Sequence, residues 1–386
     1  MLILEILFFV SGFFVFFAMI GYPISLKFLD KKVKKKKIKN SNKYEPTVTL
    51  MIVAHNEENV ILKKLDTSLK LDYPSEKIEI IIASDNSTDK TNQIVELFIE
   101  SHPSRNIKLF KVKERKGKTN AQNEAQKIVS SEILVMTDAN SILDINSIKE
   151  IVKDFYDDTI VYVTGKLEYV NSNLNSTSSS ENSYWNIDLE MRKIESDIQT
   201  ITAGNGALYA VRNKDYFDIP LIHCHDSYFP QYFALKSKRC VFNEKAIAYE
   251  KAGENNEDEY KRKVRMNRTI LEDSFFHWNY LNFLKYKWFS YFYFGHRKCR
   301  YLLWLNHLII FVTNGLLLKE NIFYSLFFIF QCLFYFLGII GLFYKKNRML
   351  NIIHYYTLTV VAQIHGMYNC FTGKAKPFWE KAESTR

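Results

Sequence analysis

A repeated pattern between residues 47 and 137 constrains the fold of this chain more than any other feature. Short apolar segments with strand character alternate with segments of helical periodicity, and these strands are expected at 47–54, 78–84, 107–111 and 133–137. Such alternation is typical of a layered α/β domain with a largely parallel sheet and helices on both faces. Ligands of these sheets bind beyond the carboxyl ends of the strands, so residues that follow each strand are candidate site residues.

The pattern continues with weaker signals after the fourth strand. A Ser/Asn-rich stretch at 171–183 predicts a surface loop, and a further strand is expected at 207–211. Helices are expected at about 57–69, 88–101, 119–129 and 184–196, from 226 onward, and at about 257–271.

The fourth strand ends in Asp138-Ala-Asn140-Ser141, an acid and an amide at spacing two. Carboxylate and amide oxygens are ligands that suit Mg²⁺ or Mn²⁺ bound to a diphosphate. Asp, Asn and Ser also form turns, and taken alone the motif favours a turn.

The first two strands also end in polar residues. His55-Asn-Glu57-Glu58 follows the first strand, and Asp85-Asn-Ser-Thr-Asp89 follows the second. Side chains at these positions can bind a nucleoside, since a carboxylate accepts hydrogen bonds from a base N–H or a ribose hydroxyl. Helix capping explains either cluster equally well when each is considered separately.

A basic loop precedes the third helix, with the sequence Arg115-Lys-Gly-Lys118-Thr-Asn120. Basic side chains and a Gly at a helix N-terminus form an anion site, because free N–H groups and the helix dipole face the ligand. A solvated basic turn is the alternative. Three polar strand ends and this loop at one edge of a sheet favour a shared site over separate caps.

The apolar residues concentrate at the two ends of the chain, although the formal net charge is +10. Residues 2–29 are almost uncharged and long enough to span a bilayer. Seven lysines between 31 and 39 predict a cytosolic middle domain and an external N-terminus, and they can also bind anionic lipid headgroups. No basic-aromatic recognition module is present, so we do not expect nucleic-acid binding. Five cysteines without paired spacing indicate free thiols.

The carboxyl-terminal third predicts further membrane segments. Aromatic residues interleaved with Lys and His at 273–300 indicate an interfacial amphipathic segment, and two spans follow within 301–344. A third apolar segment, 351–371, contains His354 and His365, and the charge rule suggests that it is re-entrant or interfacial. The expected organisation is a transmembrane helix (1–30), a polybasic linker (31–45), a cytosolic catalytic domain (46–272), the interfacial segment (273–300), two transmembrane helices (301–344), the third apolar segment (351–371) and a basic tail (372–386).

The motifs together resemble the membrane-bound branch of the family 2 glycosyltransferases, which transfer sugars from nucleotide-diphospho-sugars and have the GT-A fold. The resemblance covers about residues 47–271. It rests on the three strand ends described above, on Lys116-Gly-Lys118 with Asn123, and on the runs 203–212 (Ala-Gly-Asn-Gly-Ala-Leu-Tyr-Ala-Val-Arg), 225–226 (His-Asp) and 260–265 (Tyr-Lys-Arg-Lys-Val-Arg).

This resemblance implies roles for individual residues. Asp226 would be the general base, Asp138 and Asn140 would hold a divalent cation (Mg²⁺ or Mn²⁺), and Lys118 would lie near the phosphates. The donor nucleotide would contact Asp85 at the base and Glu57 near the ribose, with His55 in the same cluster, and Arg262 and Arg265 would cover the diphosphate. Gly204, Asn205 and Gly206 would line the acceptor site.

Two departures from the family pattern affect the prediction. Asn140 stands where the usual metal motif has a second acid, and His225 stands where an acid is common. If Asp226 instead caps a helix that begins at residue 227, the base assignment is lost. The Gln-x-x-Arg-Trp signature of the processive synthases is absent from the sequence, which favours transfer of a single sugar.

The expected function is therefore inverting transfer of a sugar, from a UDP-sugar, to a hydroxyl of a lipid-linked or membrane-proximal glycan. The protein would be a multi-pass cell-membrane enzyme of surface polysaccharide or glycolipid biosynthesis, with its catalytic domain in the cytoplasm. A processive exopolysaccharide synthase and a non-catalytic, membrane-anchored sugar-nucleotide-binding protein are the alternatives.

Overall fold

The computed structural model of the protein describes residues 1–171, 176–253, 256–344 and 347–378. Contacts within the chain divide it into two compact units. The sheet unit comprises Lys34–Val170, Arg192–Lys251 and Lys376–Arg386, and the helical unit comprises Met1–Val33, Asn171–Met191 and Ala252–Ala375.

Eight strands of the described residues form one mixed sheet in the order β3-β2-β1-β4-β7-β6-β8-β5. The strands β1 to β4 and the pair β6 and β8 run parallel, whereas β7 is antiparallel to both of its neighbours and β5 is antiparallel to β8. Their bounds are β1 Val48–Ala54, β2 Ile78–Ser84, β3 Ile107–Lys111, β4 Ile133–Asp138, β5 Ile142–Leu143, β6 Ile160–Tyr169, β7 Tyr209–Arg212 and β8 Arg239–Glu250.

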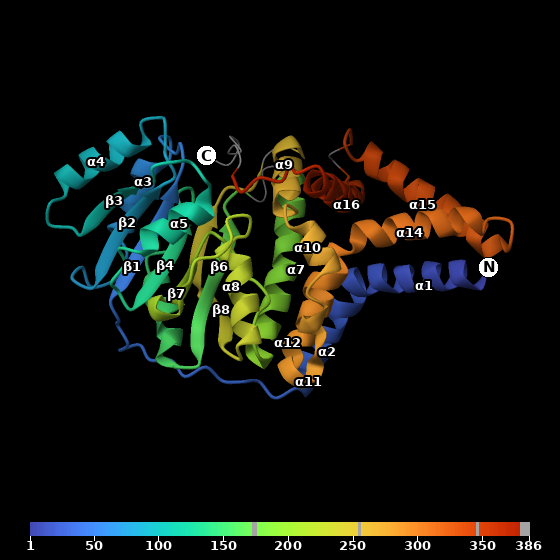
Figure 1. Ribbon diagram of the computed structural model, residues 1–386, viewed down its shortest axis with the longest axis horizontal. Helices are drawn as coiled ribbons and strands as arrows, with labels where there is room; N and C mark the ends of the chain where they lie inside the picture. The colour runs from blue at the N-terminus through green and yellow to red at the C-terminus, as the bar shows by residue number, and fades with distance from the viewer. Residues whose placement is uncertain (172–175, 254–255, 345–346, 379–386) are drawn as a thin grey trace. The chain divides into compact units, whose positions relative to one another are not determined.

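Helices cover both faces of this sheet, as the sequence predicts (Figure 1). Strand β1 is buried along its whole length, which is the expected result for a central parallel strand between two layers of helices. The helices of this unit are α3 Ile61–Ser68, α4 Thr91–Ser101, α5 Lys118–Gln126, α6 Ser147–Lys153 and α8 His225–Leu235, and α7 Ser176–Ile198 has residues in both units.

The parallel register brings the polar strand ends together. Ala54 pairs with Ser84 across β1 and β2, and Val53 pairs with Asp138 across β1 and β4. The residues that follow β1 and β2 therefore lie beside the end of β4. This arrangement confirms that the polar clusters share one edge of the sheet.

The second unit is helical in its described residues. It contains α1 Leu2–Phe16, α2 Tyr22–Lys32, α9 Asn256–Met266, α10 Ile270–Phe275, α11 Phe283–Tyr286, α12 Trp288–Phe292, α13 Cys299–Tyr301, α14 Leu303–Leu316, α15 Ile322–Ile340 and α16 Arg348–Phe371. A π-helical turn, Phe17–Gly21, joins α1 to α2, and a second one, Tyr293–Lys298, joins α12 to α13.

Two helical stretches, Leu2–Lys32 and Ile322–Ile340, are long and apolar enough to cross a membrane, while Leu303–Leu316 is apolar but shorter. Helices α1, α14 and α15 lie side by side (Figure 1), and a buried cluster that includes Phe8 and Tyr324 packs them together. Large apolar side chains on their outer faces are exposed.

Helix boundaries differ from the prediction where composition gave a misleading signal. The stretch 171–183 was expected to be a loop, but α7 begins at Ser176, while residues 172–175 lie outside the described residues. The helix expected at 257–271 is divided into α9 and α10 by a turn at 267–269. Lys345 and Lys346, and residues 379–386 of the predicted tail, also lie outside the described residues.

Candidate active site

Asp85 follows β2 directly and fixes the basic loop before α5. Its Oδ1 accepts a hydrogen bond from the backbone N–H of Lys116 (3.1 Å), and its Oδ2 accepts one from Gly117 N–H (2.9 Å). The Asp85 side chain is buried, and Gly117 has φ +99°, a conformation that L side chains rarely adopt. Both carboxylate oxygens thus hold the basic loop in place. The predicted contact of Asp85 with the nucleobase stays a prediction.

The first strand end is joined to the second by hydrogen bonds. His55 Nδ1–H donates to the carbonyl of Asp85 (2.7 Å), and Thr88 N–H donates to Oδ1 of Asn56 (2.8 Å). Glu57 is buried, and its backbone N–H donates to the Thr91 hydroxyl at the start of α4 (2.7 Å). The predicted nucleoside-binding residues His55, Glu57 and Asp85 therefore belong to one connected group.

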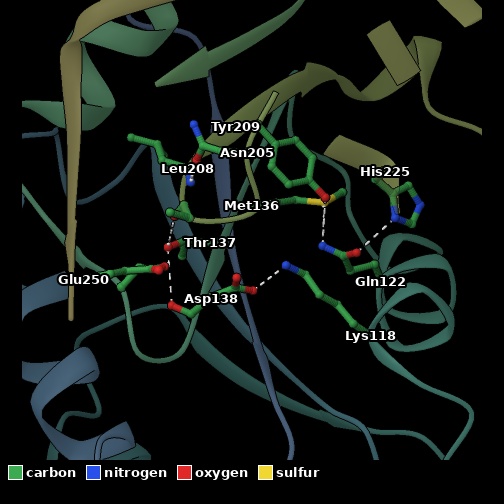
Figure 2. Close-up of polar contacts among 12 residues, drawn as sticks. Lys118, Gln122, Met136, Thr137, Asp138, Asn205, Leu208, Tyr209, His225 and Glu250 are labelled. Carbon is green, nitrogen blue, oxygen red and sulfur yellow. Dashed lines mark hydrogen bonds and ion pairs between the residues drawn. The ribbon is translucent and has the colours of Figure 1, made fainter. Parts of the chain in front are cut away.

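The predicted phosphate-binding and metal-binding residues meet as an ion pair. Lys118 is the first residue of α5, and its ammonium donates to Oδ1 of Asp138 at the end of β4 (Figure 2). Burial alone would lower the pKa of Lys118, but the carboxylates of Asp138 and Asp226 outweigh it and raise that pKa above its usual value. Lys118 is thus a charged ammonium that two of the predicted site carboxylates attract.

A glycine loop closes around this ion pair. A Cβ added to Gly206 would lie 2.9 Å from Lys118 Nζ and 3.1 Å from Asp138 Oδ2, so a larger residue would displace the end of the Lys118 side chain. A Cβ added to Gly204 would lie 2.1 Å from the hydroxyl of Tyr162. The close approach of the buried Tyr162 side chain therefore requires glycine at position 204, and glycine at position 206 leaves the space beside the ion pair open.

Asn205, between these glycines, has a structural contribution that its sequence position did not suggest. It is buried, and its Nδ2 donates to the carbonyl of Gly165 (2.7 Å), while its Oδ1 accepts from Leu208 N–H (3.2 Å). The amide therefore fixes the loop. Its predicted contact with the acceptor stays a prediction.

Asp226 lies in the first turn of α8, which begins at His225 after an extended N-cap residue, Cys224. Asp226 is therefore not the N-cap, and the capping explanation for this acid does not hold. Its backbone carbonyl accepts a hydrogen bond from Gly204 N–H (2.6 Å). This bond attaches the candidate base to the glycine loop that borders Lys118 and Asp138.

The His225 ring lies in a buried polar network that includes Gln122 and Tyr209 (Figure 2). Its Nδ1–H donates to Gln122 Oε1 (2.9 Å), and the Gln122 amide donates to the hydroxyl of Tyr209 (2.9 Å). Burial, together with the charge of Lys118, lowers the pKa of His225 to about 3, so the ring is neutral. His225 therefore connects α8 to α5, the helix that begins with Lys118.

Arg262 and Arg265 lie on α9, in the helical unit, whereas the other predicted site residues lie in the sheet unit. Arg262 already binds Glu259 through two hydrogen bonds, from Nε at 2.8 Å and from Nη2 at 3.1 Å. Tyr355 also donates its hydroxyl proton to Glu259 (3.1 Å). The role of both arginines with a diphosphate stays a prediction.

Asp138 and the space beside Gly206 fit a divalent cation that is bound together with a diphosphate. Mg²⁺ commonly takes one or two protein carboxylates plus phosphate oxygens instead of a complete protein cage. Asp138 provides one carboxylate, with Oδ2 facing the space that Gly206 leaves open, and Asn140 is two residues away. The described residues contain no cluster of three or more His, Cys, Asp or Glu that could bind a metal by themselves.

Two residues around this site escaped sequence reasoning. Lys64 on α3 is fully buried and donates to the Thr137 hydroxyl (2.9 Å), and Glu250 at the end of β8 accepts from the hydroxyl of Ser141. The signal for Lys64 was a charged residue on the buried face of an amphipathic helix, where apolar residues are expected. No comparable signal identified Glu250, because β8 was not predicted.

Comparison with known proteins identifies the kind of domain that carries these residues. Residues 49–218 match the family model for glycosyl transferase family 2. The chain is 29% identical to a poly-beta-1,6-N-acetyl-D-glucosamine synthase from Staphylococcus epidermidis over 31% of this chain and 27% of the relative. It is 32% identical to a beta-monoglucosyldiacylglycerol synthase from Synechocystis over 28% of this chain and 23% of the relative. The alignments thus span less than a third of these relatives.

A solved structure shares the fold over nearly the whole chain. The mannosyltransferase PcManGT from Pyrobaculum calidifontis, solved in complex with GDP-Man and Mn²⁺, superposes with a TM-score of 0.69 at 19% identity, covering 95% of this chain and 99% of the other. At this identity the likeness establishes the fold, which is the GT-A fold expected from the sequence. Residues 49–218 therefore carry a glycosyl transferase family 2 domain within this fold.

Proposed function

We propose that the protein is an inverting glycosyltransferase that moves one sugar from a nucleotide-diphospho-sugar to an acceptor hydroxyl at a membrane. The observation that carries this proposal is the connection of Lys118, Asp138 and Asp226 through the glycine loop. Lys118 pairs with Asp138 beside Gly206, and Gly204 N–H binds the carbonyl of Asp226. The glycine loop therefore lies beside Lys118, the proposed phosphate-binding residue, and binds the backbone of Asp226, the candidate base.

In the proposed reaction, the carboxylate of Asp226 takes the proton of the acceptor hydroxyl while that oxygen attacks the anomeric carbon. The bond from this carbon to the diphosphate oxygen breaks, and the nucleoside diphosphate leaves with the electron pair. One displacement of this kind inverts the configuration at the anomeric carbon. Lys118 stabilises the negative charge that develops on the leaving diphosphate.

Asp138, with Asn140 as a second oxygen ligand, would hold a divalent cation bound to the diphosphate. The cation would supply Lewis-acid stabilisation of the leaving group. Mn²⁺ was present in the solved mannosyltransferase structure, which supports a test with Mn²⁺ and Mg²⁺. The Lys118 ammonium and the cation would share the neutralisation of the diphosphate.

We further propose that the donor is a UDP-sugar and that the acceptor is a lipid-linked or membrane-proximal glycan. Two helices long and apolar enough to cross a membrane support a membrane location. The lysines between 31 and 39 favour anionic headgroups and a cytosolic catalytic domain, in a multi-pass cell-membrane protein. One relative is named a glucosyldiacylglycerol synthase, which supports a lipid-linked product.

The experiment that tests the proposal is sugar transfer by the full chain in detergent or nanodiscs. Labelled UDP-sugars and GDP-sugars are offered with Mn²⁺ or Mg²⁺ and a membrane-lipid extract. Asp226→Asn should abolish transfer but leave binding of the nucleotide nearly unchanged. Asp66→Asn, on the exposed face of α3, should behave like the wild type.

Two alternatives give different results in the same assay. If wild-type protein binds a nucleotide-sugar and transfers nothing to any extract, the non-catalytic alternative is correct. A processive polymerase is supported by the relative named as a poly-N-acetylglucosamine synthase. Labelled product that lengthens without release of short intermediates would establish that alternative.

A further inference from the structure

A lysine is buried beneath the strand end that carries Asp138. Lys64 lies on α3 with no exposed surface, on the same buried face as Ile61 and Leu65. Burying an ammonium in a protein core is costly unless hydrogen bonds compensate for the lost water. Its neighbour Lys63 is exposed and provides a matched comparison on the same helix. The position of Lys64 therefore requires a reason in its contacts.

Those contacts span the turn that contains the predicted cation ligands. The Lys64 ammonium donates to the hydroxyl of Thr137 (2.9 Å) and to the backbone carbonyl of Ser141. These two acceptors flank Asp138, Ala139 and Asn140 in the sequence. The ammonium thus fixes the turn at both ends.

The same contacts extend to the glycine loop. The Thr137 hydroxyl, which accepts from Lys64, donates its own proton to the carbonyl of Ala207 (2.7 Å), next to Gly206. From the other side, Ser141 donates its hydroxyl proton to Glu250. Figure 2 shows Thr137 and Glu250 around Asp138. A single relay therefore joins α3, the end of β4 and the loop that borders the ion pair.

Burial lowers the pKa of Lys64 to about 7, and two carboxylates near the turn limit this shift. Asp138 and Glu250 both attract the ammonium and oppose the effect of burial on its pKa. Asn140 contributes an amide where the usual metal motif of the family 2 glycosyltransferases has a second carboxylate. Lys64 supplies two hydrogen bonds to this turn, which has a single carboxylate among its predicted cation ligands.

We propose that Lys64 is a positioning residue that holds the Asp138–Ser141 turn and the 203–207 loop as one unit, so that cation and diphosphate binding depend on it. This inference rests on the proposed function. Lys64 itself contacts neither donor nor acceptor. It acts through Thr137 and the carbonyl of Ser141, as outer residues act on metal ligands in other proteins.

The test uses full-length protein in detergent with four variants. Lys64→Met removes the ammonium at similar length, and Thr137→Val removes the hydroxyl at nearly the same shape. The double variant completes a mutant cycle, and Lys63→Met is the control. Titrations with UDP and with GDP as probes, at varied Mn²⁺, give the half-saturating Mn²⁺ concentration, and transfer assays give kcat and KM for the donor.

We expect Lys64→Met and Thr137→Val each to raise the half-saturating Mn²⁺ concentration and the donor KM by about 10-fold or more. The double variant should be little worse than either single variant, because both cut the same relay. Lys63→Met should leave all constants unchanged. Unchanged constants in Lys64→Met, with only a smaller active fraction and a lower melting temperature, would show a purely structural lysine and overturn the inference.

Hydrogen exchange separates this inference from the proposed function. In Lys64→Met, amide exchange should accelerate in both 138–141 and 203–207, whereas in Lys63→Met it should not change. This result is independent of nucleotide binding and catalysis. If the wild type neither binds nucleotides nor transfers sugar, the proposed function fails, yet faster exchange in both segments still supports the positioning of the turn and loop. Exchange that is unchanged in both segments overturns it.

Discussion

The buried side chain of Lys64 makes the free energy of unfolding depend on pH. The substitution Lys64→Met should remove this dependence. Burial lowers the pKa of Lys64 from 10.5 to about 7, although Asp138 and Glu250 act in the opposite direction. In the unfolded chain the group regains its ordinary pKa. Between pH 7 and 10.5 the unfolded state therefore binds more protons than the folded state, and stability rises with pH across this window.

The size of the rise follows from the two pKa values. They differ by 10.5 − 7 = 3.5, and each pKa unit corresponds to about 1.4 kcal/mol, so the rise is at most about 5 kcal/mol. Below pH 7 the folded protein carries the full cost of a buried charge. Lys64→Met should therefore gain stability relative to wild type at low pH and lose this advantage as the pH approaches 10.

The assay is the melting temperature of wild type, Lys64→Met and Lys63→Met in detergent from pH 6.5 to 10, without nucleotide or divalent cation. Groups common to all three proteins cancel in the difference between curves. We expect the difference between Lys64→Met and wild type to change by several degrees, since about 1 kcal/mol corresponds to roughly 2–4 °C in a domain of this size. Lys63→Met should follow wild type. Parallel curves for Lys64→Met and wild type across the whole range would refute the reasoning.

Three further predictions concern the candidate site. Gly206→Ala should weaken UDP binding by about 10-fold or more, because its Cβ would lie 2.9 Å from Lys118 Nζ and displace that ammonium. Gly315→Ala is the control, since its Cβ would meet only an ordinary contact at 3.7 Å. Titration with UDP and Mn²⁺ measures both affinities, and equal affinities would contradict the described loop. Asn140→Asp should lower the half-saturating Mn²⁺ concentration, because a carboxylate binds the cation more tightly than an amide, and an unchanged concentration would mean that residue 140 is not a ligand. His225→Leu should destabilise the protein by about 1–3 kcal/mol by leaving buried polar groups unpaired. Because the pKa of His225 is held at about 3 by burial and Lys118, this change should not move the acidic limb of the pH–rate profile between pH 5 and 8, and a moved limb would identify His225 as a titrating group.

Much of the fold could be predicted because its first half consists of short buried strands with clear ends. The strands at 78–84 and 107–111 have the predicted bounds, and the ends of β1 and β4 differ by one residue. Periodicity is strong there because these strands are buried between helices. By contrast, neither β6 nor β8 was predicted, and these strands are 10 and 12 residues long and follow their apolar residues with charged ones.

The antiparallel position of β7 also could not be predicted, because a strand's partner is set by tertiary packing and not by its own composition. The Ser-rich segment before Tyr184 gives a loop signal, yet α7 extends back to Ser176. The Ser-rich composition did not predict this helix, because intrinsic propensity is only a weak guide to secondary structure.

For the site, sequence reasoning identified the residues at strand ends and missed the contacts that hold them. Polar residues after a buried strand predict Asp85 and Asp138, and a basic loop at a helix N-terminus predicts Lys118. That both oxygens of Asp85 bind backbone N–H groups could not be read from the sequence, because those groups lie 31 and 32 residues away. Lys64 lies 73 residues from Thr137, so its role depends on tertiary contact alone.

The hydrogen bond from Gly204 N–H to the carbonyl of Asp226 has a consequence for engineering this enzyme. The loop predicted to face the acceptor and the residue predicted to activate it are joined through backbone atoms, which substitution of side chains leaves in place. Grafting the loop alone from a relative with another acceptor would disturb this hydrogen bond and displace Asp226, the candidate general base. The region from Ala203 to Asp226 should therefore be exchanged as a single cassette, together with Tyr162, whose hydroxyl sets how closely Gly204 can approach.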